Sequence, residues 1–105
     1  MLGITFKENC PDVRNTKVVD ILNTLAGYGT QLTIYDPWAS PTEVKHEYGW
    51  ESTRTLPKER NYSAVVLAVS HQEFEKLEWD KICKENTVIY DVKGILPRDL
   101  VDARL

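Results

Sequence analysis

The run Ala64–Val69, with the sequence Ala-Val-Val-Leu-Ala-Val, constrains the fold more than any other stretch of the chain. It has the length of a β-strand, and none of its side chains is polar. A strand at the surface of a sheet alternates polar and apolar residues, whereas a strand that is apolar on both sides is typical of the centre of a parallel sheet. The run therefore predicts an α/β domain whose sheet is covered by helices on both faces.

Segments with strand and helix patterns alternate along the rest of the chain. We expect further strands at 1–5, 31–35 and 87–90, a short one near 50–53, helices at 17–28, 41–48, 73–76 and 79–84, a helical turn at 56–60 and a short final helix at 97–105. Strands alternating with helices through right-handed crossovers give a three-layer doubly wound parallel sheet. The 105 residues suffice for one domain with one core, so we expect a single domain over 1–105.

Two of the expected helices carry clear local signals. The segment 17–28 places apolar side chains on one face, at Val18, Ile21, Leu22 and Leu25. The segment 41–48 follows a potential capping serine, begins with a proline and contains a glutamate that completes a capping box, and a glycine follows it. These signals predict where both helices begin and end.

The ten-residue loop after the first expected strand carries two cations, Lys7 and Arg14, together with Glu8 and Asp12. A loop after the first strand of an α/β domain lies at the carboxyl edge of the sheet, where such folds bind ligands. Two separated cations suit a ligand with separated negative charges, such as a diphosphate or a nucleotide. Alternatively, both cations are solvated or pair with Glu8 and Asp12, and the charge pattern leaves both interpretations open.

A dinucleotide site of the Rossmann type needs glycines in the first strand-to-helix turn, so that a pyrophosphate can approach the helix N-terminus. The segment 6–15 contains no glycine. Asp36 stands where a ribose-binding acid would lie, but without that glycine turn we interpret it as a stabiliser of the Asp-Pro-Trp turn. The architecture is therefore Rossmann-like without the cofactor fingerprint. A response-regulator receiver is excluded as well, because acids are missing after the first and central strands.

Composition and charge narrow the partners. A net charge of −3 and a pI near 5.3 argue against nucleic acid, since no basic face could neutralise a phosphate backbone. No apolar run approaches the roughly 20 residues that span a bilayer, and no signal peptide is visible, so we expect a cytoplasmic protein. His46 and His71 lack partner spacing and are interpreted as surface or edge residues, and Cys10 as a loop residue without a role.

The segment Gly3–Lys17, Gly-Ile-Thr-Phe-Lys-Glu-Asn-Cys-Pro-Asp-Val-Arg-Asn-Thr-Lys, resembles the opening of the C-terminal, UDP-binding domain of the UDP-glucose/GDP-mannose dehydrogenase family. Its Phe-Lys pair and its Asp-x-Arg-x-Thr pattern are distinctive. Later blocks, at Tyr35–Pro37, Ala64–Val69 and Asp91–Gly94, resemble family blocks in the same order. The wording of the first block is most similar to the branch that acts on UDP-N-acetylhexosamines for bacterial surface polysaccharide.

This resemblance implies roles for four residues. Phe6 and Lys7 would contact the UDP-sugar substrate, and Arg14 would reach NAD across a domain cleft. Lys93 falls in the block where the family places a substrate-binding arginine, and the Lys-Gly found here departs from that pattern. The family oxidises the sugar C6 hydroxyl to a carboxylate with two molecules of NAD, through a thiohemiacetal and a thioester on a cysteine.

The resemblance also implies what this chain lacks. The nucleophilic cysteine and the Rossmann glycines belong to the family's N-terminal and central domains, and Cys10 lies in a different motif. We therefore expect a detached domain of a longer, homo-oligomeric dehydrogenase, inactive alone, with UDP-N-acetylhexosamine or UDP-glucose as ligand. The abrupt start in a strand agrees with this expectation. The alternative is a freestanding α/β binding or interaction module.

Overall fold

The structure of the chain is a computed structural model that describes residues 1–58 and 62–104. Its elements are α1 (Val18–Gly27), α2 (Pro41–Tyr48), β1 (Tyr62–Leu67), the 3-10 turns η1 (Gln72–Lys76) and η2 (Trp79–Lys81), β2 (Cys83–Asp91) and β3 (Ala103–Arg104). None of the helices in the described ranges is both long and apolar enough to cross a membrane.

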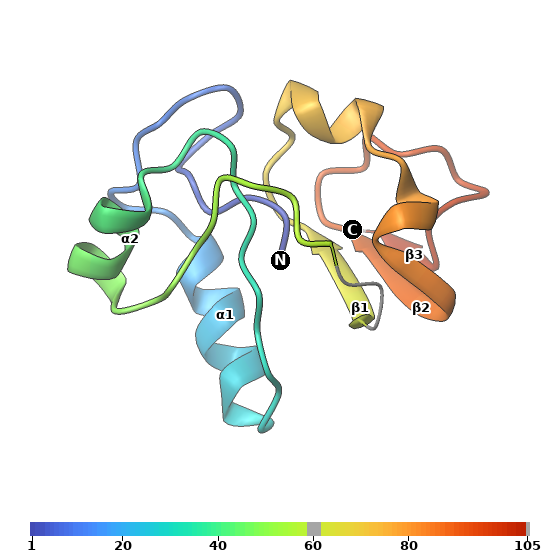
Figure 1. Ribbon diagram of the computed structural model, residues 1–105, viewed down its shortest axis with the longest axis horizontal. Coiled ribbons are helices and arrows are strands. Elements are labelled where there is room, and N and C mark those ends of the chain that lie inside the picture. Colours follow the sequence, from blue (N-terminus) through green and yellow to red (C-terminus); the bar gives the residue numbers. More distant parts are fainter. Residues whose placement is uncertain (59–61, 105) are drawn as a thin grey trace.

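The sheet is parallel throughout its described pairs. β1 pairs with β2 and β2 with β3, both in parallel (Figure 1). Three single-residue parallel bridges extend this sheet on the other side of β1, joining Leu67 to Leu2, Leu2 to Tyr35, and Tyr35 to Thr53. The segment at Leu2 is therefore central, and the chain winds outward from it in both directions. This arrangement confirms the predicted doubly wound α/β fold.

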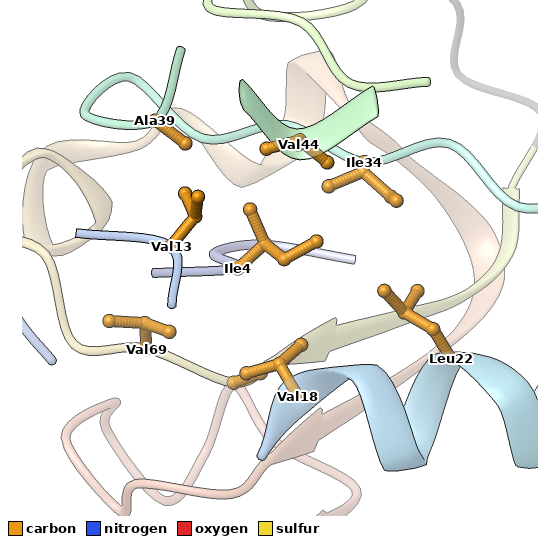
Figure 2. Close-up of a cluster of buried hydrophobic side chains, with 9 residues drawn as sticks. Ile4, Val13, Val18, Leu22, Ile34, Ala39, Val44 and Val69 are labelled. Atoms are coloured by element: carbon orange, nitrogen blue, oxygen red, sulfur yellow. The ribbon is translucent and has the colours of Figure 1, made fainter. Parts of the chain in front are cut away.

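Two clusters of buried apolar side chains form the core. The first joins α1 and α2 to the strand ends, through Ile4, Val13, Val18, Leu22, Ile34, Ala39, Val44, Ala68 and Val69 (Figure 2). The second packs the strands against η1, through Leu2, Tyr35, Val65, Leu67, Phe74, Ile89 and Leu96. Apolar residues of β1 and the residues just after it contribute to both clusters, as expected for a strand in the middle of a three-layer domain.

Both long helices follow the local signals. α2 begins with Pro41 after Ser40, whose side-chain oxygen accepts a hydrogen bond from the Glu43 N–H, and it ends at Gly49, which has a φ of 75°. The predicted helix at 17–28 is α1, and the Thr16 hydroxyl accepts a hydrogen bond from the Val18 N–H at 3.2 Å. Capping and apolar periodicity therefore define these two elements well.

Three local predictions were wrong or only partly right. The segments at 73–76 and 79–84 form the short 3-10 turns η1 and η2 instead of α-helices. The expected helix at 97–105 is wrong, because its described end is β3. Asp102 exchanges two hydrogen bonds with the backbone of Ile89, and these fasten the tail to β2 as a further strand. The segment 56–58 is not helical, and residues 59–60 of that predicted turn lie outside the described residues.

Gly3 is required where the first strand crosses between the two core clusters. Its φ is 93°, and a Cβ built on it would lie 2.6 Å from the Cβ of Val69 and 3.0 Å from the Val69 backbone nitrogen. Leu2 before it belongs to the second cluster and Ile4 after it to the first. A side chain at residue 3 would therefore meet both steric overlap and backbone strain.

We expect Gly3→Ala to destabilise the domain by more than about 2 kcal/mol, because it combines overpacking with a strained φ. Gly27→Ala is the matched control, since its Cβ would meet nothing within 4 Å at the end of α1. The control should be neutral or stabilising by up to about 1 kcal/mol. Urea unfolding of both variants measures the difference, and equal midpoints would contradict this account of Gly3.

Candidate functional site

The carboxyl edge of the sheet is organised by the buried side chain of Asp36, which is 1% exposed. Its Oδ2 accepts hydrogen bonds from the Ile4 and Thr5 N–H groups at 2.7 and 3.2 Å. Its Oδ1 accepts from the Trp38 and Ala39 N–H groups at 2.7 and 3.1 Å. The predicted role of Asp36 in the Asp-Pro-Trp turn is confirmed, and the same carboxylate also holds the end of the first strand.

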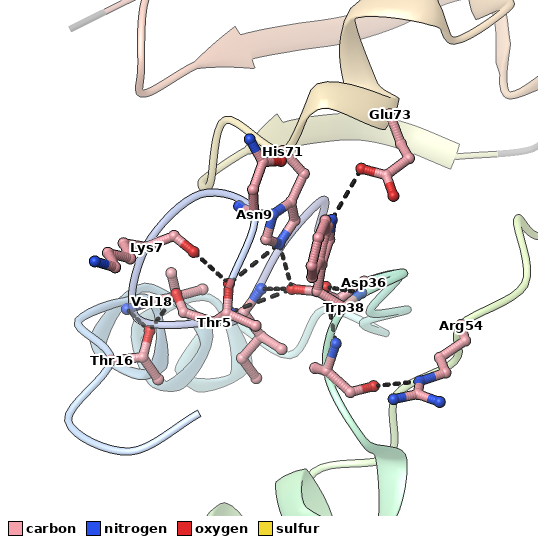
Figure 3. Close-up of polar contacts among 12 residues, drawn as sticks. Thr5, Lys7, Asn9, Thr16, Val18, Asp36, Trp38, Arg54, His71 and Glu73 are labelled. Atoms are coloured by element: carbon pink, nitrogen blue, oxygen red, sulfur yellow. Dashed lines mark hydrogen bonds and ion pairs between the residues drawn. The ribbon is translucent and has the colours of Figure 1, made fainter. Parts of the chain in front are cut away.

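His71 is the second buried polar group at this edge, with a side chain that is 0% exposed. Its Nε2 lies 3.0 Å from Asp36 Oδ2 and 3.1 Å from Thr5 Oγ1, and its Nδ1 accepts a hydrogen bond from the Asn9 N–H at 2.9 Å (Figure 3). A backbone N–H can only donate, so Nδ1 carries no proton and the neutral ring carries it on Nε2. The interpretation of His71 as a surface or edge residue was wrong, whereas His46 is exposed as expected.

These bonds set the charge of Asp36. Burial of the carboxyl raises its pKa, but the hydrogen bond from His71 and those from the Ile4 and Trp38 amides outweigh burial. The pKa of Asp36 therefore lies below its ordinary value, and the group is a buried carboxylate at neutral pH. Five donors around one carboxylate supply the compensation that a buried charge requires.

A second buried aspartate shapes the turn after β2. The Asp91 side chain is 0% exposed, and its Oδ1 accepts hydrogen bonds from the Lys93 and Gly94 N–H groups at 3.0 and 2.8 Å. Its Oδ2 accepts from the Leu96 N–H at 2.8 Å. The Lys93 backbone is therefore fixed, while its side chain remains exposed. Asp36 and Asp91 thus perform the same structural task at two strand ends.

The loop 6–15 doubles back on itself above this edge. The Phe6 N–H donates to the Asp12 carbonyl at 2.8 Å, which closes the first half of the loop. Asn9 and Asn15 have positive φ values of 52° and 58°, a conformation that asparagine tolerates better than most residues. The loop therefore has a defined shape, and it presents Phe6 with 57% of its surface exposed.

Phe6 and Lys93, two of the predicted site residues, line one hollow of about 180 Å³ at the carboxyl edge. Lys17 at the start of α1 lines it too, a residue that the sequence analysis did not select. Its only sequence signal is that it follows the same loop as a third cation. Lys7 lies next to this hollow in the chain, and its side chain points away from the His71 network (Figure 3). Within residues 1–58 and 62–104, no acidic side chain pairs with the ammonium groups of Lys7 or Lys93.

Arg14 lies in a different hollow, between the loop and α2. That hollow is also lined by Asp12, Glu43 and Glu47. The guanidinium donates from Nε to Asp12 Oδ1 at 3.1 Å and from an Nη to Asp12 Oδ2 at 3.3 Å. The hydrogen bond from Arg14 holds the pKa of Asp12 below its ordinary value. The predicted pairing of a loop cation with Asp12 is thus correct for Arg14, and the structure separates Arg14 from Phe6 and Lys93.

Comparison with known proteins adds the family. Residues 1–98 match the model of the UDP-glucose/GDP-mannose dehydrogenase family, UDP binding domain. The chain belongs to this family. It is 45% identical over 108 residues to UDP-N-acetyl-D-glucosamine 6-dehydrogenase from Pseudomonas aeruginosa and 41% identical over 108 residues to the enzyme of the same name from Salmonella typhi. Protein CapL from Staphylococcus aureus is 40% identical over 102 residues.

These relatives confirm the resemblance to the N-acetylhexosamine branch. The first two alignments cover 100% of this chain and the third covers 94%. The chain nevertheless spans only about a quarter of the length of these relatives, 25% of the first two and 24% of the third. The family membership therefore concerns one domain's worth of sequence.

The buried carboxylate of Asp36 predicts a specific pH dependence. Because its pKa is lower in the folded state, its contribution to stability is present above the unfolded pKa of about 3.9 and is lost as the pH falls through the lower folded pKa. Asp36→Asn places an NH₂ or a weaker oxygen against five donors and should cost about 1–3 kcal/mol at pH 7. The variant should also show a flatter dependence of stability on pH below about 4.

Urea unfolding between pH 7 and pH 2 measures both effects. Asp12→Asn is the control, because it alters an exposed carboxylate paired with Arg14 and should leave stability at pH 7 nearly unchanged. If Asp36→Asn kept the full acid-induced loss of the parent, the assignment of that loss to Asp36 would be wrong.

Proposed function

We propose that residues 1–105 form the nucleotide-sugar-binding C-terminal domain of an NAD-dependent UDP-sugar 6-dehydrogenase. The observation that carries the proposal is the combination of the family match with the hollow at the carboxyl edge. That hollow offers an exposed aromatic face and cations that no described acid neutralises. A diphosphate attached to an aromatic base is the kind of ligand that such a surface suits.

Phe6, Lys7 and Lys93 are the proposed substrate contacts, and Lys17 is added to them from its place in the hollow. The two lysines that line the hollow, Lys17 and Lys93, approach it from different elements, the start of α1 and the turn after β2. An ammonium acts as a point charge, so this arrangement would hold a diphosphate without demanding one geometry. Phe6 would cover the contact and exclude water from it.

The hollow is too small to hold a whole UDP-sugar. It measures about 180 Å³, whereas pockets for small ligands usually enclose roughly 300–1,000 Å³. We infer that other parts of the dehydrogenase complete the site, namely its N-terminal and central domains. The isolated chain should therefore bind UDP weakly, near millimolar on the order of a fragment-sized contact, and should not oxidise the sugar.

NAD is the proposed cofactor, and it would accept hydride from the sugar C6 position in the complete enzyme. Arg14 is the residue of this chain that we assign to it. Arg14 lies in a hollow apart from Phe6 and Lys93, with a side chain that is 76% exposed. Its guanidinium is already oriented by two bonds to Asp12, which leaves its remaining donors available to a phosphate. A homo-oligomeric enzyme and a cytoplasmic location remain predictions, and no observation favours a freestanding module.

Lys7→Ala should weaken UDP-sugar binding by roughly 10- to 150-fold in the complete dehydrogenase, because a charge-assisted contact to the diphosphate is lost. Its KM for the UDP-sugar should rise accordingly, and the effect should shrink at high salt. Lys81→Ala is the matched control, an exposed lysine on η2 that pairs with Glu78. An unchanged KM in Lys7→Ala, with no amide shifts at 5–16 or 91–95 on addition of UDP, would refute the assignment.

Arg14→Ala should raise the KM for NAD well above any change in the KM for the UDP-sugar. The physical reason is the separation of the two hollows, which places Arg14 away from the substrate contacts. Steady-state kinetics with each substrate varied in turn measures both constants. Equal increases, or an increase for the sugar nucleotide alone, would reject the cofactor role.

A further inference from the structure

The loop that carries Phe6 and Lys7 is fastened to the turn after β1 by a reciprocal pair of hydrogen bonds. The Asn9 N–H donates to His71 Nδ1 at 2.9 Å, and the Gln72 N–H donates to Asn9 Oδ1 at 2.9 Å. The residues involved are 62 and 63 positions apart in the chain. Asn9 meets both partners in a left-handed conformation, with a φ of 52°. The shape of the loop thus depends on a residue far away in sequence.

His71 also reaches residue 7, through Thr5. The neutral ring donates its Nε2–H toward Asp36 Oδ2 and Thr5 Oγ1, at 3.0 and 3.1 Å. The Thr5 hydroxyl in turn donates to the Lys7 carbonyl at 2.9 Å (Figure 3). One imidazole therefore fixes the backbone at residue 7 by one route and at residue 9 by the other.

The ring cannot exchange its two nitrogens easily. Its centroid lies 6.0 Å from that of Trp38, with planes 25° apart, and 5.4 Å from that of Phe74, at 59°. Trp38 is itself held by a hydrogen bond from its Nε1 to Glu73 at 2.9 Å. A ring flip would turn carbon atoms toward the Asn9 amide and toward Asp36, leaving buried polar groups without partners.

We propose that His71 is a positioning residue for the nucleotide-sugar contact, holding the loop 6–10 so that Phe6 and Lys7 meet the ligand. The inference rests on the proposed function of that loop. The ring itself is fully buried, so it does not touch the ligand and acts through the Asn9 amide and the Lys7 carbonyl. His71 requires the neutral Nε2–H tautomer for this task, because protonation of Nδ1 would place two donors face to face.

A pair of substitutions separates positioning from core packing. The side-chain oxygen of His71→Asn can take the place of Nδ1 and accept the Asn9 N–H, but it cannot reach Asp36. The terminal amide of His71→Gln can take the place of Nε2 and donate to Asp36, but it leaves the Asn9 N–H without an acceptor. Both variants lose the aromatic ring, so the lost packing is common to them, and the difference between them reports the Asn9 contact.

The experiment measures KM and kcat of the complete dehydrogenase with the UDP-sugar and NAD varied in turn. We expect His71→Gln to raise the KM for the UDP-sugar roughly tenfold relative to His71→Asn, as loss of one neutral hydrogen bond allows. The kcat and the KM for NAD should differ little between the two. Equal KM values for the UDP-sugar in both variants, or equal rises in every constant, would overturn the proposal.

Two further measurements cover the case in which neither His71 variant folds. The imidazole ¹⁵N shifts of the unmodified protein should show Nδ1 without a proton, and a protonated Nδ1 at neutral pH would overturn the proposal. Thr5→Val removes the hydroxyl link to Lys7, and Thr5→Ser retains it. The valine variant should raise the KM for the UDP-sugar above that of the serine variant, and equal values would count against the link.

Lys7→Ala in the same assay distinguishes failure of this inference from failure of the proposed function. If Lys7→Ala raises the KM for the UDP-sugar while His71→Gln and His71→Asn match, the site stands and the positioning role fails. If Lys7→Ala has no effect, the proposed contact fails. Hydrogen exchange at the Asn9 amide then tests the positioning of the loop independently of any ligand, with faster exchange expected in His71→Gln than in His71→Asn.

Discussion

The carboxylate of Asp36 is the interaction on which the carboxyl edge of this domain depends. A charge removed from water is costly unless donors surround it. Here the donors come from the end of the first strand, from the Asp-Pro-Trp turn and from His71 after β1. Three chain segments can satisfy the charge only when they meet at one point. The need to compensate Asp36 therefore fixes how these three strand ends lie relative to one another.

Asp91 repeats this arrangement at the next strand end, and together the two aspartates explain why the binding edge has a definite shape. Each accepts backbone N–H groups of the turn that follows it. The side chains that we assign to the ligand need no such internal partners. Phe6 and Lys93 are exposed, whereas the backbone next to them is held from below. Polar bonds in the interior thus leave the charged and aromatic groups at the surface available for a nucleotide.

The sequence carried the architecture well and the site in part. Short-range patterns encode α1 and α2, and the apolar run at 64–69 marks the centre of the sheet. Phe6 and Lys93 meet because parallel strands end at the same edge, which topology alone predicts. His71 escaped detection because it stands between polar neighbours, and its partners Thr5 and Asp36 are 66 and 35 residues away. No periodicity reports contacts of that range. The tail at 97–105 was misjudged for the same reason, since its partner is the backbone of β2.

The central place of the first strand has a consequence for how the domain is made on the ribosome. Leu2 bridges Tyr35 on one side and Leu67 on the other, so the segment synthesised first waits for a neighbour that emerges some sixty residues later. Non-local parallel pairing of this kind is slow, and domains form as units while synthesis proceeds from the N-terminus. The loop at 6–10 waits longer still, because its amide partner is His71. The earliest residues to leave the ribosome are thus among the last to acquire their final shape.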